Sequence, residues 1–137
     1  MTNLSNDDRR QLAAVVRRAD ELATARDVDG YLALTTDDMV LDGAQGRASG
    51  RDAVQAAIRR IWAAEPPGTL HLTSNITVLP HGDDEASASS TLSLASGTPT
   101  NPEVWAVAAI TQLLRRTSRG WLIARRSVGE GTGDAGQ

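Results

Sequence analysis

The sequence predicts a single α+β domain in which helices cover one side of a curved antiparallel sheet. Two long helical patterns occupy the first half of the 137 residues, and the second half changes to extended segments joined by turn-forming residues. Helices gathered on one side of an antiparallel sheet are typical of this fold class. A chain of this length fits one domain and can bury a hydrophobic core without disulfides.

Capping signals and apolar spacing predict the helices. After a polar lead over residues 1–6, Ser5 and Asp8 have the form of a capping box. Apolar residues then recur at helical spacing as far as Ala23, which makes one buried stripe. A short second helix is expected over residues 28–34.

A turn, a short strand and a third helix complete the first half of the chain. Residues 35–38 have the composition of a turn, and residues 39–41 are expected to form the strand. The third helix places Ile58 and Trp62 on one face and is stopped by Pro66. The domain is expected to span residues 7–128, followed by a glycine-rich tail over 129–137 that is expected to be disordered.

Four extended segments with turns between them predict an antiparallel meander. These segments cover residues 70–79, 85–95, 103–116 and 121–128. Pairing Leu79 with Glu85 would place Leu72 and Val78 on an apolar face. His71 would then lie on the opposite face, which is lined with hydroxyl groups, away from the helices.

The third of these segments is apolar on both faces. The alternate residues that begin at Val104 and those that begin at Trp105 are both mainly hydrophobic. An antiparallel strand with two apolar faces implies that both faces are covered. Helices cover one of them, and a second subunit is the simplest cover for the other. We therefore predict a homodimer through the sheet.

Composition excludes several classes of chemistry. The chain has no cysteine, and all 14 basic residues are arginine, which excludes thiolate catalysis and a lysine Schiff base. A net charge of −3 without a basic stretch predicts no nucleic-acid partner. No apolar run or signal segment is evident, so a cytoplasmic protein without a membrane partner is expected. His71 and His81 do not form a pattern typical of a metal site, and no cofactor is expected.

Several segments resemble the SnoaL-like branch of the NTF2-like superfamily. They are Asp27 to Gly43, Gly50-Arg-Asp-Ala-Val, His71-Leu-Thr-Ser-Asn and Gly120 to Arg126, and the similarity spans about residues 8–128. The resemblance implies a cone in which three N-terminal helices pack on a curved antiparallel sheet and enclose a pocket. The family includes polyketide cyclases, ketosteroid isomerases and dehydratases, and also pocket proteins that catalyse no reaction.

The resemblance implies two functions. The first is a cofactor-independent enzyme that performs isomerisation, cyclisation or dehydration by proton transfer on a small hydrophobic, oxygenated molecule, for example one resembling a polyketide. The second is a non-catalytic module of the same fold that binds a small molecule or dimerises. Fold alone does not choose between them.

His71 and Asp42 are the candidate catalytic residues. His71 is similar to a histidine near the start of the equivalent strand in dehydratases of the superfamily, and an imidazole both takes and gives a proton near neutral pH. The other interpretation is a histidine on the surface or at the dimer interface. Asp42 lies one residue before Gly43, which matches the isomerase proton shuttle, so Asp42 reaches the cavity only through a bulge.

Six further residues are candidates for binding the ligand. They are Tyr31, Trp62, Asn75, Trp105, Thr111 and Arg126. Arg126 is expected to bind a carboxylate or enolate oxygen, unless it extends into solvent or pairs with Asp42. Trp105 and Trp62 would stack a flat ligand, although Trp62 also suits the core. Thr111 would stabilise developing negative charge on the ligand. Tyr31 would donate a hydrogen bond at the pocket mouth or anchor the short helix. Asn75 would form hydrogen bonds with backbone groups at a strand distortion.

Overall fold

The computed structural model of the chain describes residues 4–43 and 46–129. The elements in chain order are α1 (Asn6–Ala25), α2 (Val28–Leu32), β1 (Thr35–Gly43), β2 (Gly46–Ser49), α3 (Arg51–Ala64), β3 (Leu70–Pro80), β4 (Glu85–Thr98), β5 (Asn101–Thr117) and β6 (Gly120–Val128). The predicted α+β class is confirmed. Most of the tail that was predicted to be disordered lies outside the described residues.

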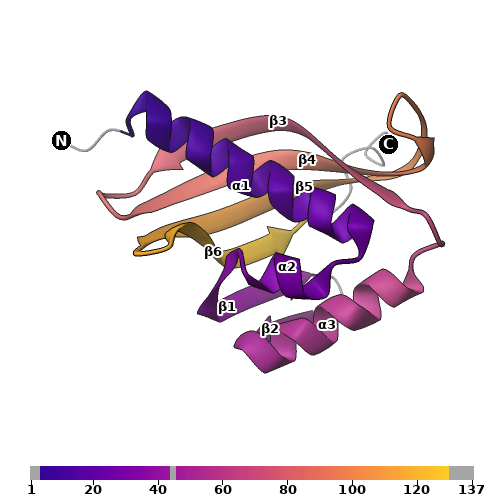
Figure 1. The fold of residues 1–137 in the computed structure, drawn as a ribbon, viewed down its shortest axis with the longest axis horizontal. Coiled ribbons are helices and arrows are strands. Elements are labelled where there is room, and N and C mark those ends of the chain that lie inside the picture. The colour runs from indigo at the N-terminus through magenta and orange to yellow at the C-terminus, as the bar shows by residue number, and fades with distance from the viewer. Residues whose placement is uncertain (1–3, 44–45, 130–137) are drawn as a thin grey trace.

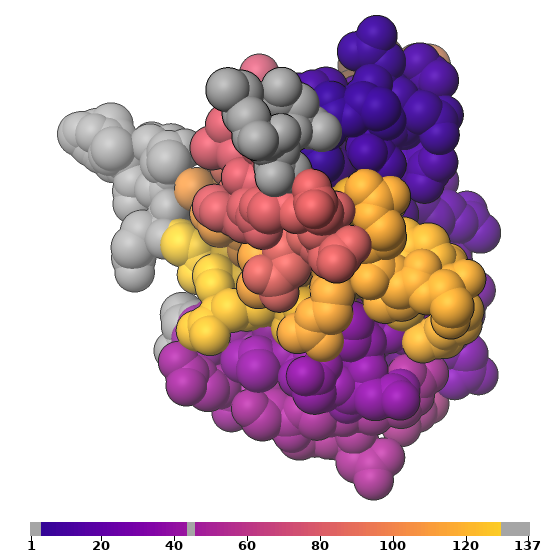
Figure 2. Space-filling model, turned by 90° about the vertical axis from the view of Figure 1, so that its left-hand side faces the viewer, coloured from indigo at the N-terminus to yellow at the C-terminus, as the bar shows by residue number. Residues whose placement is uncertain are grey.

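The strands form one six-stranded sheet in the order β2-β1-β6-β5-β4-β3, and the three helices lie on one side of it (Figure 1). All neighbouring strands are antiparallel except β1 and β6, which are parallel. Helix α1 packs on β3, while α3 packs on β1 and β2. Figure 2 views the end of the molecule where the β3–β4 and β5–β6 turns lie between α1 and the α2–α3 layer.

The predicted capping box of α1 is present, because Asp8 N donates to Ser5 Oγ at 2.9 Å and Ser5 N donates to an Asp8 carboxylate oxygen at 3.4 Å. The apolar stripe of α1 is buried against the sheet and includes Leu12 and Val16. The helix ends at Arg26, whose backbone is in the left-handed region with φ of 59°. Leu4, within the predicted polar lead, is buried in the same core.

Strand β1 is longer than predicted, and the prediction of a turn over residues 35–38 is wrong. Thr35 pairs with Ile123 of β6 and is almost fully buried, and the register shifts before Val40 pairs with Arg125. Polar residues made this segment resemble a turn, but the irregular pairing accommodates them within the sheet. The short strand β2 was not predicted.

The register predicted for the β3–β4 hairpin is wrong next to the loop, and β3 also contains a bulge at Asn75. Next to the loop Val78 pairs with Ala88 instead of the predicted Ala86. A difference of two residues keeps the same face of the strand, so the predicted apolar face is toward the helices here. The register then shifts between Ser74 and Thr77, and Asn75 has φ of 56°. A one-residue shift exchanges the two faces of a strand. The bulge therefore turns His71 from the predicted outer face to the inner face.

Candidate functional site

A cavity of about 170 Å³ lies between the helices and the concave face of the sheet. We call it the inner hollow. Its lining residues are Asp20, Ala23, Tyr31, Leu41, Ile58, Ile61, Trp62, Glu65, His71, Leu92, Leu94, Ala108, Arg126 and Val128. Most of these side chains are apolar, and the few polar ones come from α1, α2, the end of α3, the start of β3 and the end of β6. This composition is typical of a small-molecule site.

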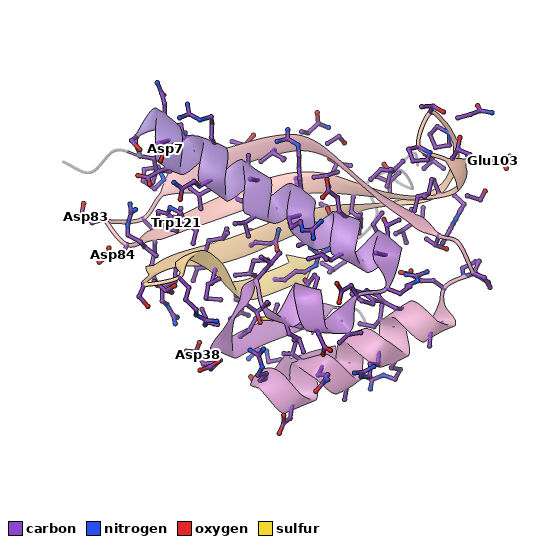
Figure 3. All side chains as sticks on the ribbon, viewed as in Figure 1. Asp7, Asp38, Asp83, Asp84, Glu103 and Trp121 are labelled. Atoms are coloured by element: carbon purple, nitrogen blue, oxygen red, sulfur yellow. The ribbon has the colours of Figure 1, made fainter. Side chains whose placement is uncertain are left out.

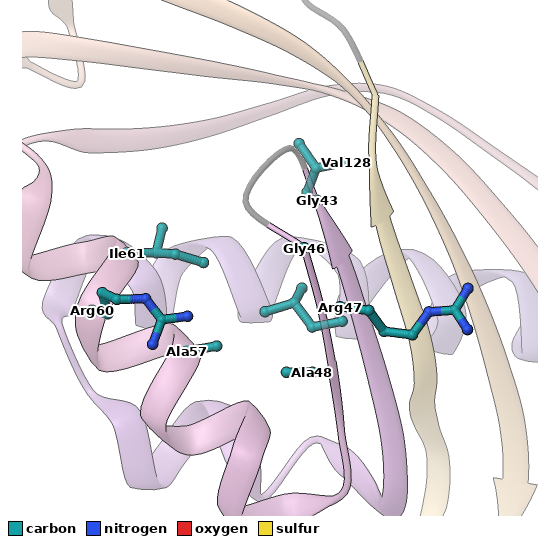
Figure 4. A pocket seen from close by; sticks show the side chains of 9 residues that line it. Gly43, Gly46, Arg47, Ala48, Ala57, Arg60, Ile61 and Val128 are labelled. Atoms are coloured by element: carbon teal, nitrogen blue, oxygen red, sulfur yellow. The ribbon is translucent and has the colours of Figure 1, made fainter.

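A second hollow of about 240 Å³ adjoins the first, between α3 and the β1–β2 hairpin (Figure 4). We call it the outer hollow. The two hollows share Leu41, Ile61 and Val128 in their linings. Together they fall in the range of roughly 300–1,000 Å³ that is usual for ligand pockets.

His71 lines the inner hollow and is held by Glu65. The His71 Nε2 atom lies 2.9 Å from Glu65 Oε1, and Arg26 Nη1 lies 2.5 Å from the same oxygen. Burial raises the pKa of Glu65, but His71 and Arg26 outweigh this and hold the pKa below its usual value. Glu65 is therefore ionised near neutral pH and only accepts hydrogen bonds.

This arrangement selects the tautomer of His71. Since the Glu65 carboxylate only accepts, His71 Nε2 must carry a proton, and a neutral imidazole then has its lone pair on Nδ1. Nδ1 is buried and has no hydrogen-bond partner among the described residues. The lining of the inner hollow thus contains an oriented imidazole with one unused nitrogen.

Asp20 and Arg126 form a second polar pair in the inner hollow. Both side chains are at most 10% exposed, and Arg126 Nη1 lies 3.6 Å from Asp20 Oδ1. Thr73 Oγ1 donates to Asp20 Oδ2 at 2.6 Å, whereas Asp20 Oδ1 has no hydrogen-bond partner among the described residues. Arg126 lines the inner hollow, and the alternative that it pairs with Asp42 is not what the structure has, since Asp42 pairs with Arg125.

Tyr31 and Trp62 supply the aromatic wall of the inner hollow. Their ring centroids are 5.7 Å apart with an interplanar angle of 88°, an edge-to-face contact. Burial raises the pKa of the Tyr31 phenol, against a lowering by the Arg126 charge, so Tyr31 stays neutral. Burial also lowers the pKa of Arg126, but Tyr31 and Asp20 outweigh it and raise that pKa, so Arg126 stays charged. Both groups are therefore hydrogen-bond donors.

Three predicted ligand-binding residues lie outside the cavity. The prediction that Trp105 and Thr111 face inward is wrong: Trp105 is 46% exposed, and Thr111 pairs with Ser89 and Ser127 on the outer face. Both faces of β5 are apolar, so its pattern did not identify the inner one. Asn75 lies at a strand distortion as expected, but its side chain is exposed and does not line the cavity.

Asp42 also lies away from the cavity, which contradicts its proposed catalytic position. Its carboxylate accepts from Arg47 Nε at 2.7 Å and is ion-paired with Arg125. The Arg47 hydrogen bond, against desolvation and with help from Arg125, lowers the pKa of Asp42. A carboxylate with two arginine partners is a weak base, and the bulge that would turn it inward is absent at this position.

Three polar residues of this region, of which Asp20 and Gln112 are buried, were not predicted as site residues. Asp20 lies four residues after Val16 on α1 and is only 2% exposed. Its place on the apolar stripe of α1 was the missed signal. Glu65 caps the end of α3, and only tertiary structure brings it to His71. Gln112, directly opposite Arg126 on β5, is 1% exposed.

In residues 4–43 and 46–129 no group of three or more acidic, histidine or cysteine side chains is arranged to hold a metal ion. Within the same ranges no helix has the length and apolar character needed to span a bilayer.

The helices packed on a curved sheet, with a hollow between them, define a protein of the NTF2-like fold class. Residues 5–127 match the family model of the SnoaL-like domain, so the chain belongs to this family, as its sequence resemblance predicted. No curated protein matches the sequence.

Solved structures of other proteins have the same fold. A protein of unknown function with a cystatin-like fold from Nostoc punctiforme has a TM-score of 0.84 at 22% identity, covering 95% of each chain. An NTF2-like protein from Novosphingobium aromaticivorans has a TM-score of 0.75 at 25% identity, covering 90% of this chain and 82% of its own. Aln2 from a Streptomyces species has a TM-score of 0.81 at 17% identity, covering 94% of each chain.

Proposed function

We propose that the protein is a cofactor-independent enzyme that binds a small hydrophobic, oxygenated molecule in the inner hollow and moves a proton on it. The observation that carries this proposal is the His71–Glu65 pair, because His71 lines an apolar cavity and keeps a buried Nδ1 atom without a hydrogen-bond partner among the described residues. The reaction class is isomerisation, cyclisation or dehydration. Membership of the SnoaL-like family, which includes polyketide cyclases and dehydratases, supports a substrate resembling a polyketide.

The groups of the inner hollow divide the chemistry between them. His71 Nδ1 takes a proton from a carbon next to a substrate carbonyl and later returns it to the product. The Glu65 carboxylate stabilises the imidazolium formed in between, because it accepts the Nε2 hydrogen bond. Arg126 and the neutral Tyr31 hydroxyl donate to the oxygen on which negative charge develops.

The alternative is a non-catalytic module that binds the same kind of molecule. It is favoured by the position of Asp42 and Thr111, since neither of these candidate acid–base or oxyanion positions faces the cavity. The two functions differ in what His71 does. In an enzyme His71 governs proton transfer, whereas in a binding module it governs affinity alone.

Deuterium exchange into an enolisable ketone tests the proposal without knowledge of the natural substrate. We would incubate 2-tetralone, a bicyclic ketone, with the protein in D₂O and follow loss of its α-proton signals by NMR. The wild type is expected to accelerate exchange, and His71→Gln is expected to reduce this acceleration by about 10²–10⁴-fold. Glu65→Gln is expected to give a smaller loss, because the imidazole remains but its tautomer is no longer fixed.

Asp42→Asn serves as the matched control, since Asp42 lies outside the cavity, and we expect exchange at the wild-type rate. Exchange that is as fast in His71→Gln as in the wild type would contradict the role of His71. A wild type that binds 2-tetralone without accelerating exchange would favour the binding module.

We also propose the homodimer through the outer face of the sheet. This face carries exposed Ala109 and Thr111 of β5 next to the hydroxyl groups of β4, and Trp105, at the register shift of β5, is exposed as well. Sedimentation velocity is expected to show a dimer, and Trp105→Glu is expected to give the monomer because it would bury a charge at the interface. A monomeric wild type at tens of micromolar would contradict this proposal.

A further inference from the structure

The outer hollow exists because its walls are built from small residues. Gly43, Gly46 and Ala48 on the β1–β2 hairpin and Ala57 on the facing helix α3 all line it. A Cβ atom added at Gly43 or at Gly46 would meet no atom within 4 Å from the described residues beyond their chain neighbours. The outer hollow is thus an extension of the cavity, with room for a further part of a ligand that occupies the inner hollow.

The charges of the two hollows differ. In the inner hollow each charged side chain has an opposite partner, since Arg126 faces Asp20 and Glu65 is paired with Arg26. The outer hollow is lined by Arg47 and Arg60. Figure 4 shows that the Arg47 side chain points away from α3, and its Nε lies 2.7 Å from Asp42.

Arg60 extends from α3 into the space that faces β2 (Figure 4). No carboxylate within residues 4–43 and 46–129 lies within 4.0 Å of its guanidinium. The outer hollow therefore carries one positive charge that the described part of the protein does not neutralise.

We propose that the outer hollow binds the carboxylate of an amphipathic acid through Arg60, while the apolar rings of the same molecule lie in the inner hollow. The planar guanidinium fork matches a carboxylate with two parallel hydrogen bonds. The two hollows share the lining residues Leu41, Ile61 and Val128, so one ligand can extend from the inner hollow into the outer hollow along these side chains. This inference rests on the proposed ligand cavity and narrows its substrate class to aromatic or polycyclic carboxylic acids. It is independent of the proton transfer at His71.

A matched pair of probes tests the inference by calorimetric titration at neutral pH. The probes are 2-naphthylacetic acid and its amide, which have the same rings and differ in charge. The wild type is expected to bind the acid about tenfold more tightly than the amide. Arg60→Gln is expected to remove this preference and Arg60→Lys to keep part of it. Arg59→Gln, an exposed neighbour on α3 that does not line the outer hollow, is expected to keep all of it.

Three results would overturn the inference, and they separate it from the proposed function. If the wild type binds acid and amide equally, or if Arg60→Gln keeps the preference, the carboxylate subsite is wrong while the ligand cavity stands. If neither probe binds, the inference falls together with the ligand cavity. Loss of the preference in Arg60→Gln, with both probes still binding, supports it.

Discussion

Two clusters on α1 contain the same kinds of group but differ in how fully they are partnered. Near the start of the helix, both Asp8 oxygens accept from Arg116 at 3.1 Å, and Trp121 Nε1 donates to one of them at 3.4 Å. Near its end, Asp20 faces Arg126 at 3.6 Å and has one buried oxygen without a hydrogen-bond partner among the described residues. Trp121 is labelled beside the start of α1 in Figure 3.

The difference indicates what each cluster does. The Asp8 cluster satisfies its polar atoms with protein groups and stacks Arg116 over the Trp121 ring at 4.5 Å, so it fastens α1 to the sheet. The Asp20 cluster lies in a cavity and leaves hydrogen-bonding capacity unused, which is costly for a buried group unless a ligand or water uses it. We therefore assign stability to the first cluster and ligand binding to the second.

The largest effect on stability is expected from removing one charge of the Asp20–Arg126 pair in the inner hollow. Arg126→Met leaves the Asp20 carboxylate buried without its partner, which should lower the free energy of unfolding by about 3–5 kcal/mol in urea denaturation. The double variant Asp20→Leu/Arg126→Met removes both charges and should recover most of this loss. It should nevertheless bind 2-tetralone about tenfold more weakly, because the oxygen loses a charged donor.

Arg116→Met at the other end of α1 is the matched control. Arg116 is 42% exposed and Asp8 16%, more than Arg126 and Asp20, so the loss of stability should be smaller than for Arg126→Met, and 2-tetralone binding should be unchanged. If the Asp20→Leu/Arg126→Met variant binds 2-tetralone like the wild type, the assignment of ligand binding to this cluster is wrong.

The bulge at Asn75 separates the two ends of β3, and a β-branched residue there should be the next largest change. Asn75 has φ of 56°, a conformation that costs most residues roughly 1–2 kcal/mol. Asn75→Val should therefore lower the free energy of unfolding by about that amount and weaken 2-tetralone binding, since the bulge directs His71 inward. Asn75→Gly accepts the conformation and should leave both unchanged. Equal stability of the Val and Gly variants would contradict the proposed strain.

The smallest effect is expected for the Asp8 cluster, as a change in stability at acid pH. The Arg116 hydrogen bonds, against some desolvation, lower the pKa of Asp8 from 3.8 to about 2 in the folded protein. The unfolded state therefore binds a proton first, and the stability due to Asp8 is complete above about pH 4 and lost as the pH falls toward 2. Thermal unfolding of wild type and Asp8→Asn should converge over that interval. A constant difference in Tm would contradict this assignment.

Much of the fold could be predicted from the sequence, because it depends on patterns that are local. The capping box at Ser5 and the apolar stripe of α1 predicted the helix. The four segments of the meander correspond to β3, β4, β5 and β6. Bulges were not predictable in the same way. The shift at Asn75 leaves no clear sign in the alternation of side chains, yet it reverses the faces of half a strand.

The candidate site was predicted only in part for the same reason. Tyr31, Trp62, His71 and Arg126 do line the cavity, whereas strand parity placed Trp105 and Thr111 on the wrong face. Glu65 follows α3 and meets His71 only through the tertiary fold. A buried acid on a helical stripe, as at Asp20, is the one missed signal that could have been found in the sequence.

The tautomer of His71 tests the central claim most directly, because the proposed base exists only if Glu65 fixes the proton on Nε2. Two-bond ¹H–¹⁵N correlation spectra of ¹⁵N-labelled protein, at about pH 8 where free imidazole is neutral, identify the protonated nitrogen. The account predicts that His71 is the Nε2–H tautomer in the wild type and a mixture in Glu65→Gln, with the exposed His81 as an internal reference. A wild-type His71 protonated at Nδ1 would contradict the account.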